Sequence, residues 1–471
     1  MNGPVELFWL KMMRLLKIMS PNPPVGILLV GLTFLTFGTA TVQGENDGDG
    51  KTGRPAPVGQ PQPEVPTAPP PGTDVVPHLH APIVPGRNVI YSAGFQLMWN
   101  AMWDRFTKEA PKLDPVSDLA PLLNLRGIEE ADLSPGSVSV TCGYVHEGVV
   151  ERIQREMAER FPGSRFRLEG PTPDEGGPPR IVIHAHLEKT LAFEKPFVPV
   201  FRADFHFVPE NWSAARIETT PVRGFGLEAV EHPASGQVEI LHFSRPADDD
   251  WSRNRFVIEL KTLSADTELL LARLPPGPTM HATIKEVARL RREMPVDREK
   301  AQEEMKRLNS LPKEAYRRVP YRELQQVQQR VFDSNPKIVS SYDTLTVPVI
   351  DFKLCREYSE LAGRTVVNHR GEAGAATITR ASQTLRFRLD EKGLKLEDDS
   401  EMEEEENGVA GRDLDFTRPF LLLLNERKSG KTVFAAWIGN TELLEAAPEP
   451  DPAPNPLGGE ASDNDDPFAE P

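Results

Sequence analysis

The sequence predicts an α+β fold with a large mixed or antiparallel sheet, further β-sheets and a reduced set of helices. Three observations support this class. Residues 237–243, 255–263 and 266–274 are successive apolar or alternating runs separated by turn residues, as in an antiparallel meander. A charged, Gln-rich segment with helical character follows at 281–333. The other strand-like runs are clustered, without the strict strand–helix alternation typical of a parallel sheet.

The remaining elements are predicted from periodicity. Residues 137–146 alternate small or polar side chains with apolar ones and predict a strand. Residues 148–161 carry apolar residues four positions apart, which places them on one face of a helix. Shorter strands are expected at 164–169 and 181–187. Later strands are expected at 345–354, 377–389, 420–424 and 432–438.

Proline limits the helical segment. Because proline lacks the backbone N–H that a helix interior needs, we expect breaks at Pro295, Pro312 and Pro320. Residues 295–343 are interpreted as a charged helical insertion in the body of the protein.

Two segments lack the apolar residues that a packed core needs. Residues 50–86 contain 11 of the 46 prolines, and residues 448–471 contain 7 more. Such compositions cannot bury enough apolar surface to offset chain entropy. We therefore expect a disordered linker at 45–87, a folded body at 88–447 and a disordered acidic tail at 448–471.

The first 44 residues predict export. Lys11, Arg14 and Lys17 precede the uncharged run Val25–Val42, and acidic residues follow it. This pattern fits a cleaved signal peptide or a retained N-terminal membrane anchor at 1–44, with the body outside the cytoplasm. An uncleaved segment would hold the protein at the membrane, with the Pro-rich linker as a stalk.

The net charge of −16 is local. Residues 397–406 carry eight acids and no base, and the tail carries seven acids and no base. The rest of the chain is nearly neutral, which excludes the basic face of a nucleic-acid-binding protein. Cys142 and Cys355 are too few for a disulfide scaffold or a multi-Cys zinc site, and we expect two free thiols.

Other motifs favour structural roles. His184 and His186 would face one side of a strand and could bind a metal with a third ligand, but we expect ordinary core or surface histidines and no metal. Residues 429–432 share the end of a phosphate-binding loop, yet Asn425 replaces its first glycine, so a hairpin turn is expected. With no Gly-x-Ser-x-Gly and no His-Glu-x-x-His motif, we expect neither an enzyme nor a cofactor.

The end of the chain resembles the serpins, the serine protease inhibitor family. Residues 414–424, a short turn and Lys431–Gly439 are similar to the family's C-terminal signature and final hairpin. Thr417 stands where the signature has Asp or Asn. The matching signature residues are Phe416, Arg418, Pro419 and Phe420.

Further segments resemble the family in its order, over about residues 88–440. They are Asn88–Met102, Ser137–Glu169, Arg180–Phe197, Asp204–Phe207, Leu345–Gly363 and Ile378–Gly393. The resemblance places Ser137–Glu169 and Arg180–Phe197 in the large sheet A and Ile378–Gly393 in the strand before the reactive loop. Departures mark a divergent member. Ala93, Gly94 and Phe95 replace a Pro-x-Ser after Ser92, and Gln383 replaces a His in the same hydrogen-bond cluster.

The resemblance implies an inhibitor of a serine-type endopeptidase that acts as a monomer. A protease attacks an exposed loop, and the cleaved loop inserts into sheet A and traps the enzyme. The equivalent loop spans 394–415, and family spacing places the scissile bond at Asn407–Gly408. The hinge residues are Glu391, Gly393, Leu394, Lys395, Leu396 and Glu397.

This hinge is unlike the family's run of small residues. Insertion would bury one of two alternate sets of side chains. One set is Leu394, Leu396, Asp398 and Ser400, and the other is Lys395, Glu397, Asp399 and Glu401. Each set contains at least one acidic residue, and burying an unpaired carboxylate costs several kcal/mol. We therefore expect poor insertion. Three hypotheses remain, namely a serpin-family inhibitor, a non-inhibitory serpin-like module displayed on a membrane-proximal stalk, and an unrelated exported enzyme.

Overall fold

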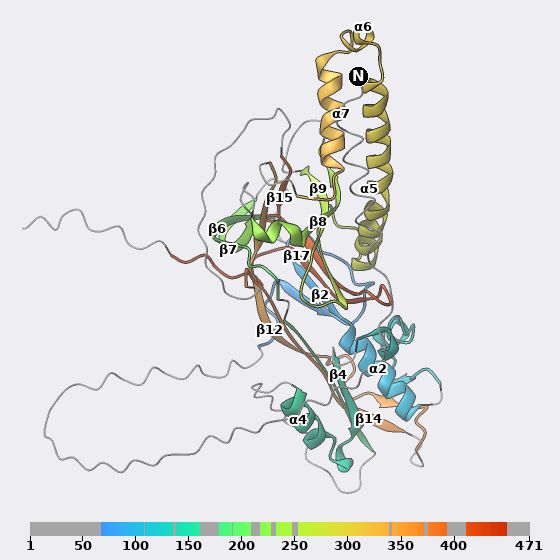
Figure 1. Ribbon diagram of the computed structural model, residues 1–471. Helices are drawn as coiled ribbons and strands as arrows, with labels where there is room; N and C mark the ends of the chain where they lie inside the picture. The colour runs from blue at the N-terminus through green and yellow to red at the C-terminus, as the bar shows by residue number, and fades with distance from the viewer. Residues whose placement is uncertain are drawn as a thin grey trace, which may run out of the picture. The chain divides into compact units, whose positions relative to one another are not determined.

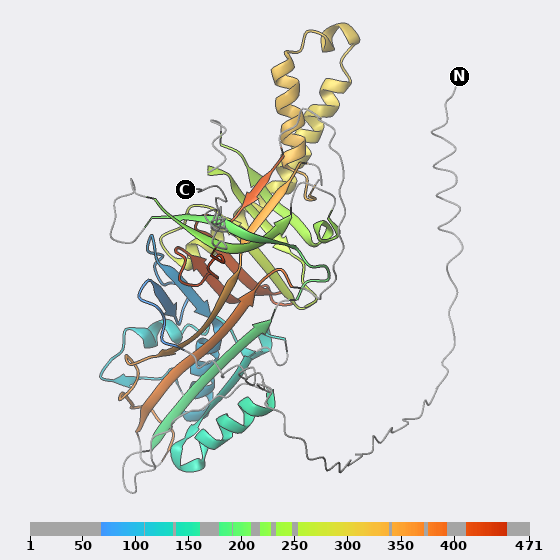
Figure 2. The same ribbon diagram turned by 90° about the vertical axis from the view of Figure 1, so that its left-hand side faces the viewer.

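The computed structural model describes a compact unit that lies within Gln62–Pro471 (Figures 1 and 2). The described residues are 67–107, 109–134, 138–160, 179–190, 192–208, 217–227, 232–246, 253–338, 342–371, 375–392 and 411–449. The expected export segment at 1–44 and the tail beyond Glu449 lie outside these ranges. Among the described residues, no helix combines the length and apolar character that a membrane span requires.

A seven-stranded sheet forms the centre of the largest apolar core. Its order is β1 (Thr73–Val76), β2 (Asn88–Ser92), β17 (Thr432–Ile438), β16 (Phe420–Glu426), β10 (Thr267–Arg273), β9 (Arg255–Leu260) and β8 (Val238–Ser244). The expected meander is confirmed, because β8, β9 and β10 pair antiparallel in sequence order. Every residue of β16 is buried, which explains its unbroken apolar run.

The second sheet contains the strands that the serpin resemblance assigned to sheet A. It runs β3 (Leu113–Asp114), β13 (Thr365–Val366), β14 (Ala376–Leu389), β5 (Arg180–Thr190) and β4 (Val138–Tyr144), with β12 (Ile350–Glu357) also paired to β14. The β14–β5 pair is parallel, whereas the other pairs are antiparallel. The α+β class with a mixed sheet is therefore confirmed.

A four-stranded sheet completes the β structure. Its order is β15 (Asp413–Asp415), β11 (Thr344–Pro348), β7 (Glu218–Leu227) and β6 (Val198–Phe207). The loop expected at 394–415 thus ends earlier than predicted, because its last three residues pair in parallel with β11.

Helix α2 (Ala93–Phe106) is buried over most of its length and packs against β4 and β5. Ser92 caps it, since its hydroxyl accepts a hydrogen bond from the backbone N–H of Gly94 at 3.3 Å. Helix α4 (Val149–Arg160) confirms the predicted amphipathic helix and packs on β4. The shorter helices are α3 (Leu119–Leu123), η1 (Glu130–Asp132), η2 (Val145–Glu147) and η3 (Pro233–Gln237).

The charged helical segment forms a hairpin whose arms, α5 (Met280–Asn309) and α7 (Tyr321–Asp333), lie side by side in both views (Figures 1 and 2). The expected break at Pro295 is wrong, because α5 continues through it. The insertion expected at 295–343 therefore has no structural boundary at its start. Pro312 and Pro320 do mark breaks, since they precede α6 (Lys313–Tyr316) and α7.

Part of the segment expected to be a disordered linker is ordered. Residues 73–76, inside the range 45–87, form β1 and pair in parallel with β2. Thr73 and Val75 are buried, and the amide of Asn88 donates to the Thr73 hydroxyl at 3.0 Å. Alternating burial and this buried hydrogen bond outweigh the Pro-rich surroundings.

Candidate functional site

The centre of the candidate site is the boundary between β5 and β14. The two strands pair in parallel from Thr377 opposite Arg180 to Arg388 opposite Thr190. No strand lies between them along this ladder. The loop insertion expected from the sequence would have to open the sheet at this boundary, because β14, which the loop segment follows, has β5 as its neighbour here. The segment 393–410 that would supply the loop directly follows the end of β14 but lies outside the described residues.

A buried hydrogen-bond cluster lies beneath this boundary. The hydroxyl of Tyr358 donates to Gln383 Oε1 at 2.9 Å, and Gln383 Nε2 approaches the Ser92 carbonyl at 3.5 Å. The association of Gln383 with Ser92 that the sequence indicated is therefore present. Burial raises the pKa of Tyr358, so its hydroxyl remains a donor. The cluster joins β14 to α2 through groups that are neutral at physiological pH.

His184 lies in the same strand pair. It is buried on β5, and its Nδ1 is 3.5 Å from the hydroxyl of Ser382 on β14. Within the described part of the chain, no three His, Cys, Asp or Glu side chains are grouped as metal ligands would be. His184 thus contributes to the contact between the two strands.

The hinge is anchored by an ion pair. Glu391, with 9% of its side chain exposed, pairs through Oε1 with Arg223 Nη2 at 2.5 Å. Arg223 Nη1 also binds Glu445 Oε1 at 2.9 Å, and this bond raises the pKa of Arg223. The Glu391 carbonyl accepts from the backbone N–H of Phe197 at 3.2 Å. We name the Arg223–Glu391 pair the hinge anchor.

Neighbouring charges reinforce the end of β14. Arg388 Nε donates to Asp390 Oδ2 at 2.7 Å, and a second nitrogen of Arg388 binds Asp351. Asp390 Oδ1 accepts from the backbone N–H of Lys392 at 2.9 Å. The strand therefore ends in a turn closed by its own carboxylate.

The other end of the 393–410 segment is held by a fully buried ion pair. Arg412 Nη2 lies 2.7 Å from Asp343 Oδ2, and neither side chain is exposed. The backbone N–H of Arg412 donates to Asp343 Oδ1 at 2.8 Å, and Arg412 Nη2 donates to the Lys337 carbonyl at 2.5 Å. We name the Arg412–Asp343 pair the exit anchor. Sequence reasoning missed both anchors.

Only Glu391 of the predicted hinge is among the described residues. Gly393, Leu394, Lys395, Leu396 and Glu397 lie outside them, as do Asn407 and Gly408 of the expected scissile bond.

The predicted signature forms a buried turn. Phe416 and Phe420 are fully buried, their ring centroids are 5.2 Å apart, and Phe416 packs edge-on against Phe256 at 5.0 Å. Thr417, the departure from the signature, is held by Asp415, whose carboxylate accepts from the Thr417 N–H at 2.8 Å and from its hydroxyl at 2.7 Å. Thr417 therefore fits this turn as a hydrogen-bond donor.

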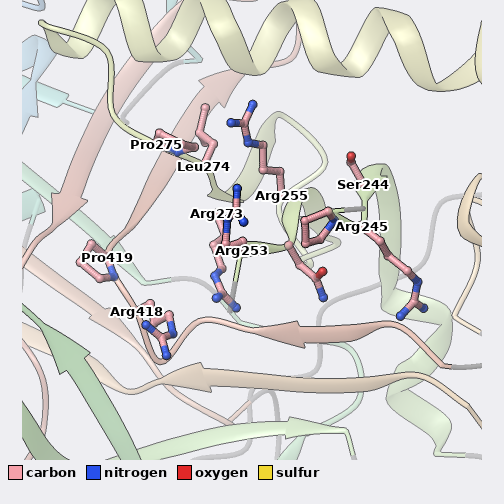
Figure 3. Close-up of a pocket in the computed structure, with 11 residues that line it drawn as sticks. Ser244, Arg245, Arg253, Arg255, Arg273, Leu274, Pro275, Arg418 and Pro419 are labelled. Carbon is pink, nitrogen blue, oxygen red and sulfur yellow. The ribbon is translucent and has the colours of Figure 1, made fainter. Parts of the chain in front are cut away.

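The remaining signature residues, Arg418 and Pro419, line a cavity of about 500 Å³ (Figure 3). Five of its eleven lining residues are arginines, and none is acidic. The arginines are Arg245, Arg253, Arg255, Arg273 and Arg418. We name this cavity the arginine pocket. Three of the five arginines lie within eleven residues, 245–255, around the β8–β9 connection. This local cluster is the sequence signal that could have indicated the pocket.

Comparison with known proteins gives matches among solved structures alone, since no protein-family model and no curated protein matches the chain. Uncleaved ovalbumin is similar at 11% identity and a TM-score of 0.39, over 75% of this chain and 94% of the ovalbumin chain. Native protease nexin-1 with heparin is similar at 12% identity and a TM-score of 0.38, over 75% of this chain and 92% of that chain. Both are serpins.

Proposed function

We propose that this chain is a serpin-like, non-enzymatic protein that acts outside the cytoplasm and presents residues 393–410 to a serine-type endopeptidase. In this proposal the loop is recognised as a substrate, in the manner of the family's inhibitors. Its acidic hinge opposes the insertion that would trap the protease. The expected outcome of an encounter is therefore cleavage of the loop and release of the enzyme.

One observation carries the proposal. β5 and β14 are paired along their length, and the hinge anchor holds the end of β14 beside Phe197. Insertion would have to separate this strand pair, break the Arg223–Glu391 ion pair and move Glu391 out of its buried place. This step is unfavourable because the Glu391 carboxylate, 9% exposed, would lose its partner, although Arg223 keeps Glu445.

The sequence of the loop adds to this cost. An inserted strand alternates its side chains between the two faces of the sheet, so either face receives acidic residues from 397–406. Carboxylates directly opposite one another or along one face also repel. The free energy that drives insertion in other serpins is thus opposed by both the hinge and the loop.

The test uses the full chain and a Glu-specific serine endopeptidase. We expect cleavage within 394–412, read by mass spectrometry, and no protease–protein complex that survives denaturing electrophoresis. A matched variant replaces Lys395, Glu397, Asp398, Asp399 and Glu401 with alanine and keeps the glutamates at 403–406. A stable covalent complex with the wild-type chain would overturn the proposal, whereas a complex with the alanine variant alone would support it.

A non-inhibitory binding or structural module displayed on a membrane-proximal stalk is the second candidate. The α5–α7 hairpin favours it, because it presents exposed surface that includes Tyr321, which is 72% exposed. This candidate requires no protease encounter. It predicts cleavage within 394–412 without a covalent complex and without a rise in melting temperature. It differs from the first proposal in that the alanine variant should also form no complex with the endopeptidase.

A further inference from the structure

The arginine pocket has the composition of an anion site. Arg273 in its lining is almost fully buried, and its Nη1 donates to the Asp415 carbonyl at 2.9 Å. Arg253, just before β9, and Arg255, the first residue of β9, are exposed, and Arg418 is contributed by the signature turn. The elements that supply these arginines belong to the same sheet or border it, so they hold the charges in fixed positions.

Acidic residues around the pocket balance part of its charge. Asp333 pairs with Arg245 at 3.1 Å, and Asp415 Oδ2 lies 3.9 Å from Arg273 Nη1. Glu286 has its pKa lowered chiefly by a hydrogen bond from Arg289, with a smaller contribution from Arg255. Asp333 and Asp415 thus compensate part of the charge of Arg245 and Arg273, whereas the lining itself contains no acidic residue.

The pocket also offers neutral donors and sufficient space. Asn254 is buried in the lining and Ser244 lies beside Arg245, so an amide and a hydroxyl accompany the guanidinium groups. The cavity volume of about 500 Å³ is larger than the volume of one tetrahedral anion. It lies within the usual range for small-ligand sites. Guanidinium groups match phosphate and sulfate oxygens through paired N–H donors.

We propose that the arginine pocket binds a small molecule that carries a phosphate or sulfate ester, with the ester group between Arg253, Arg255 and Arg418. A phosphate monoester carries nearly two negative charges at neutral pH and three acceptor oxygens, which suit several guanidinium donors. Arg245 of the lining donates to the Gly411 carbonyl at 2.6 Å, next to Arg412 of the exit anchor, but occupancy of the site does not depend on protease recognition.

The experiment titrates the full chain by calorimetry at constant ionic strength. The probes are inorganic phosphate, glycerol 3-phosphate and glucose 6-sulfate, with chloride as the reference anion. We expect saturable binding at one site per chain. Stronger binding of glycerol 3-phosphate would assign the ester as a phosphate, and stronger binding of glucose 6-sulfate would assign it as a sulfate. Absence of saturable binding with all three probes overturns the proposal.

Variants locate the site. Arg253→Gln together with Arg255→Gln should weaken binding about tenfold or more, because each removes a charge-assisted hydrogen bond. Arg255→Lys keeps the positive charge but loses the paired N–H donors, so it should weaken binding less than the double variant does. Arg202→Gln, an arginine with 61% of its side chain exposed on β6, is the matched control and should bind like the wild type. Wild-type affinity in the double variant contradicts the proposal.

The β8–β9 connection also carries three aspartates, at 248–250. A variant with asparagine at all three positions tests whether the chain's own carboxylates satisfy the arginines. Binding by the wild type that becomes tighter in this variant supports the proposal. Binding by the variant alone would contradict it, since the pocket would then have no capacity for an external anion.

Discussion

At the scale of single residues, the exit anchor is a fully buried ion pair outside the apolar core. Arg412 and Asp343 are both fully buried, and Arg412 also donates to the Lys337 carbonyl. A buried pair of this kind contributes little net stability relative to an apolar pair, but removing one partner leaves a charge without compensation. Mutation of one partner alone is therefore expected to lower the free energy of unfolding much more than replacement of both partners by apolar residues.

Arg412→Ala should lower the free energy of unfolding by about 3–5 kcal/mol, because Asp343 would stay buried without its cation. Urea unfolding of the full chain measures this change. Arg202→Ala, at an exposed position, should change it by no more than about 0.5 kcal/mol. A loss below about 1 kcal/mol in Arg412→Ala would mean that the pair is solvated, as surface pairs are.

Cys142 should be protected in the folded chain. Burial raises the pKa of its thiol from 9.0 to about 11, so very little thiolate forms at pH 8. Because the folded chain keeps this proton longer than the unfolded chain, Cys142 contributes stability below about pH 9 that is lost as the pH rises towards about 11. Alkylation followed by mass spectrometry should label Cys142 slowly at pH 8 and rapidly in urea. Equal rates in both conditions would contradict its burial.

Sequence reasoning found residues whose roles depend on neighbours in the chain and missed those whose partners are distant. Glu391 was placed in the hinge, but its partner Arg223 is 168 positions away on β7. Gln383 was tied to Ser92 because the family motif links the two positions. The arginine pocket joins residues from Arg245 to Arg418, and no local pattern records that they converge.

At the scale of elements, α5 shows how tertiary packing overrides a local signal. Its apolar face, which includes Val287, Leu290 and Met294, is buried, and the helix packs on β8. Arg291 on the same turns pairs with Glu268 at 2.6 Å. These contacts hold the helix before Pro295. After the proline, Ala301 and Leu308 are buried and the helix packs on α7, so it continues although the proline removes one backbone hydrogen bond. Periodicity predicted the helix, but only packing decides whether a proline ends it.

Pro295→Ala should therefore stabilise the protein. Pro295 is exposed, so the substitution loses no core packing and restores a backbone N–H inside the helix. We expect the free energy of unfolding to rise by about 1–3 kcal/mol, measured in urea. Val296→Ala, at a neighbouring position that is 48% exposed, should have an effect within about 0.5 kcal/mol. Destabilisation by Pro295→Ala would show that the proline is needed for the helix path.

At the scale of the whole molecule, the fold class and the strands of the large sheet followed from periodicity and from the order of the family-like segments. Strand β1 was not predicted, because its alternating pattern is short and lies within a Pro-rich segment that indicated disorder. The position of the excess negative charge in the chain is more informative than its total. Eight of the excess negative charges belong to the segment between the hinge anchor and the exit anchor, and under the proposed function they would oppose insertion between β5 and β14.

The thermal stability of the loop-cleaved chain tests this central claim most directly. The full chain is cleaved within 394–412 by the Glu-specific endopeptidase, and its melting temperature is compared with that of the intact chain. If β5 and β14 stay paired, the two melting temperatures should be equal or the cleaved chain should melt slightly lower. A sharp rise in melting temperature after cleavage would show that the loop has entered the sheet and would contradict the account.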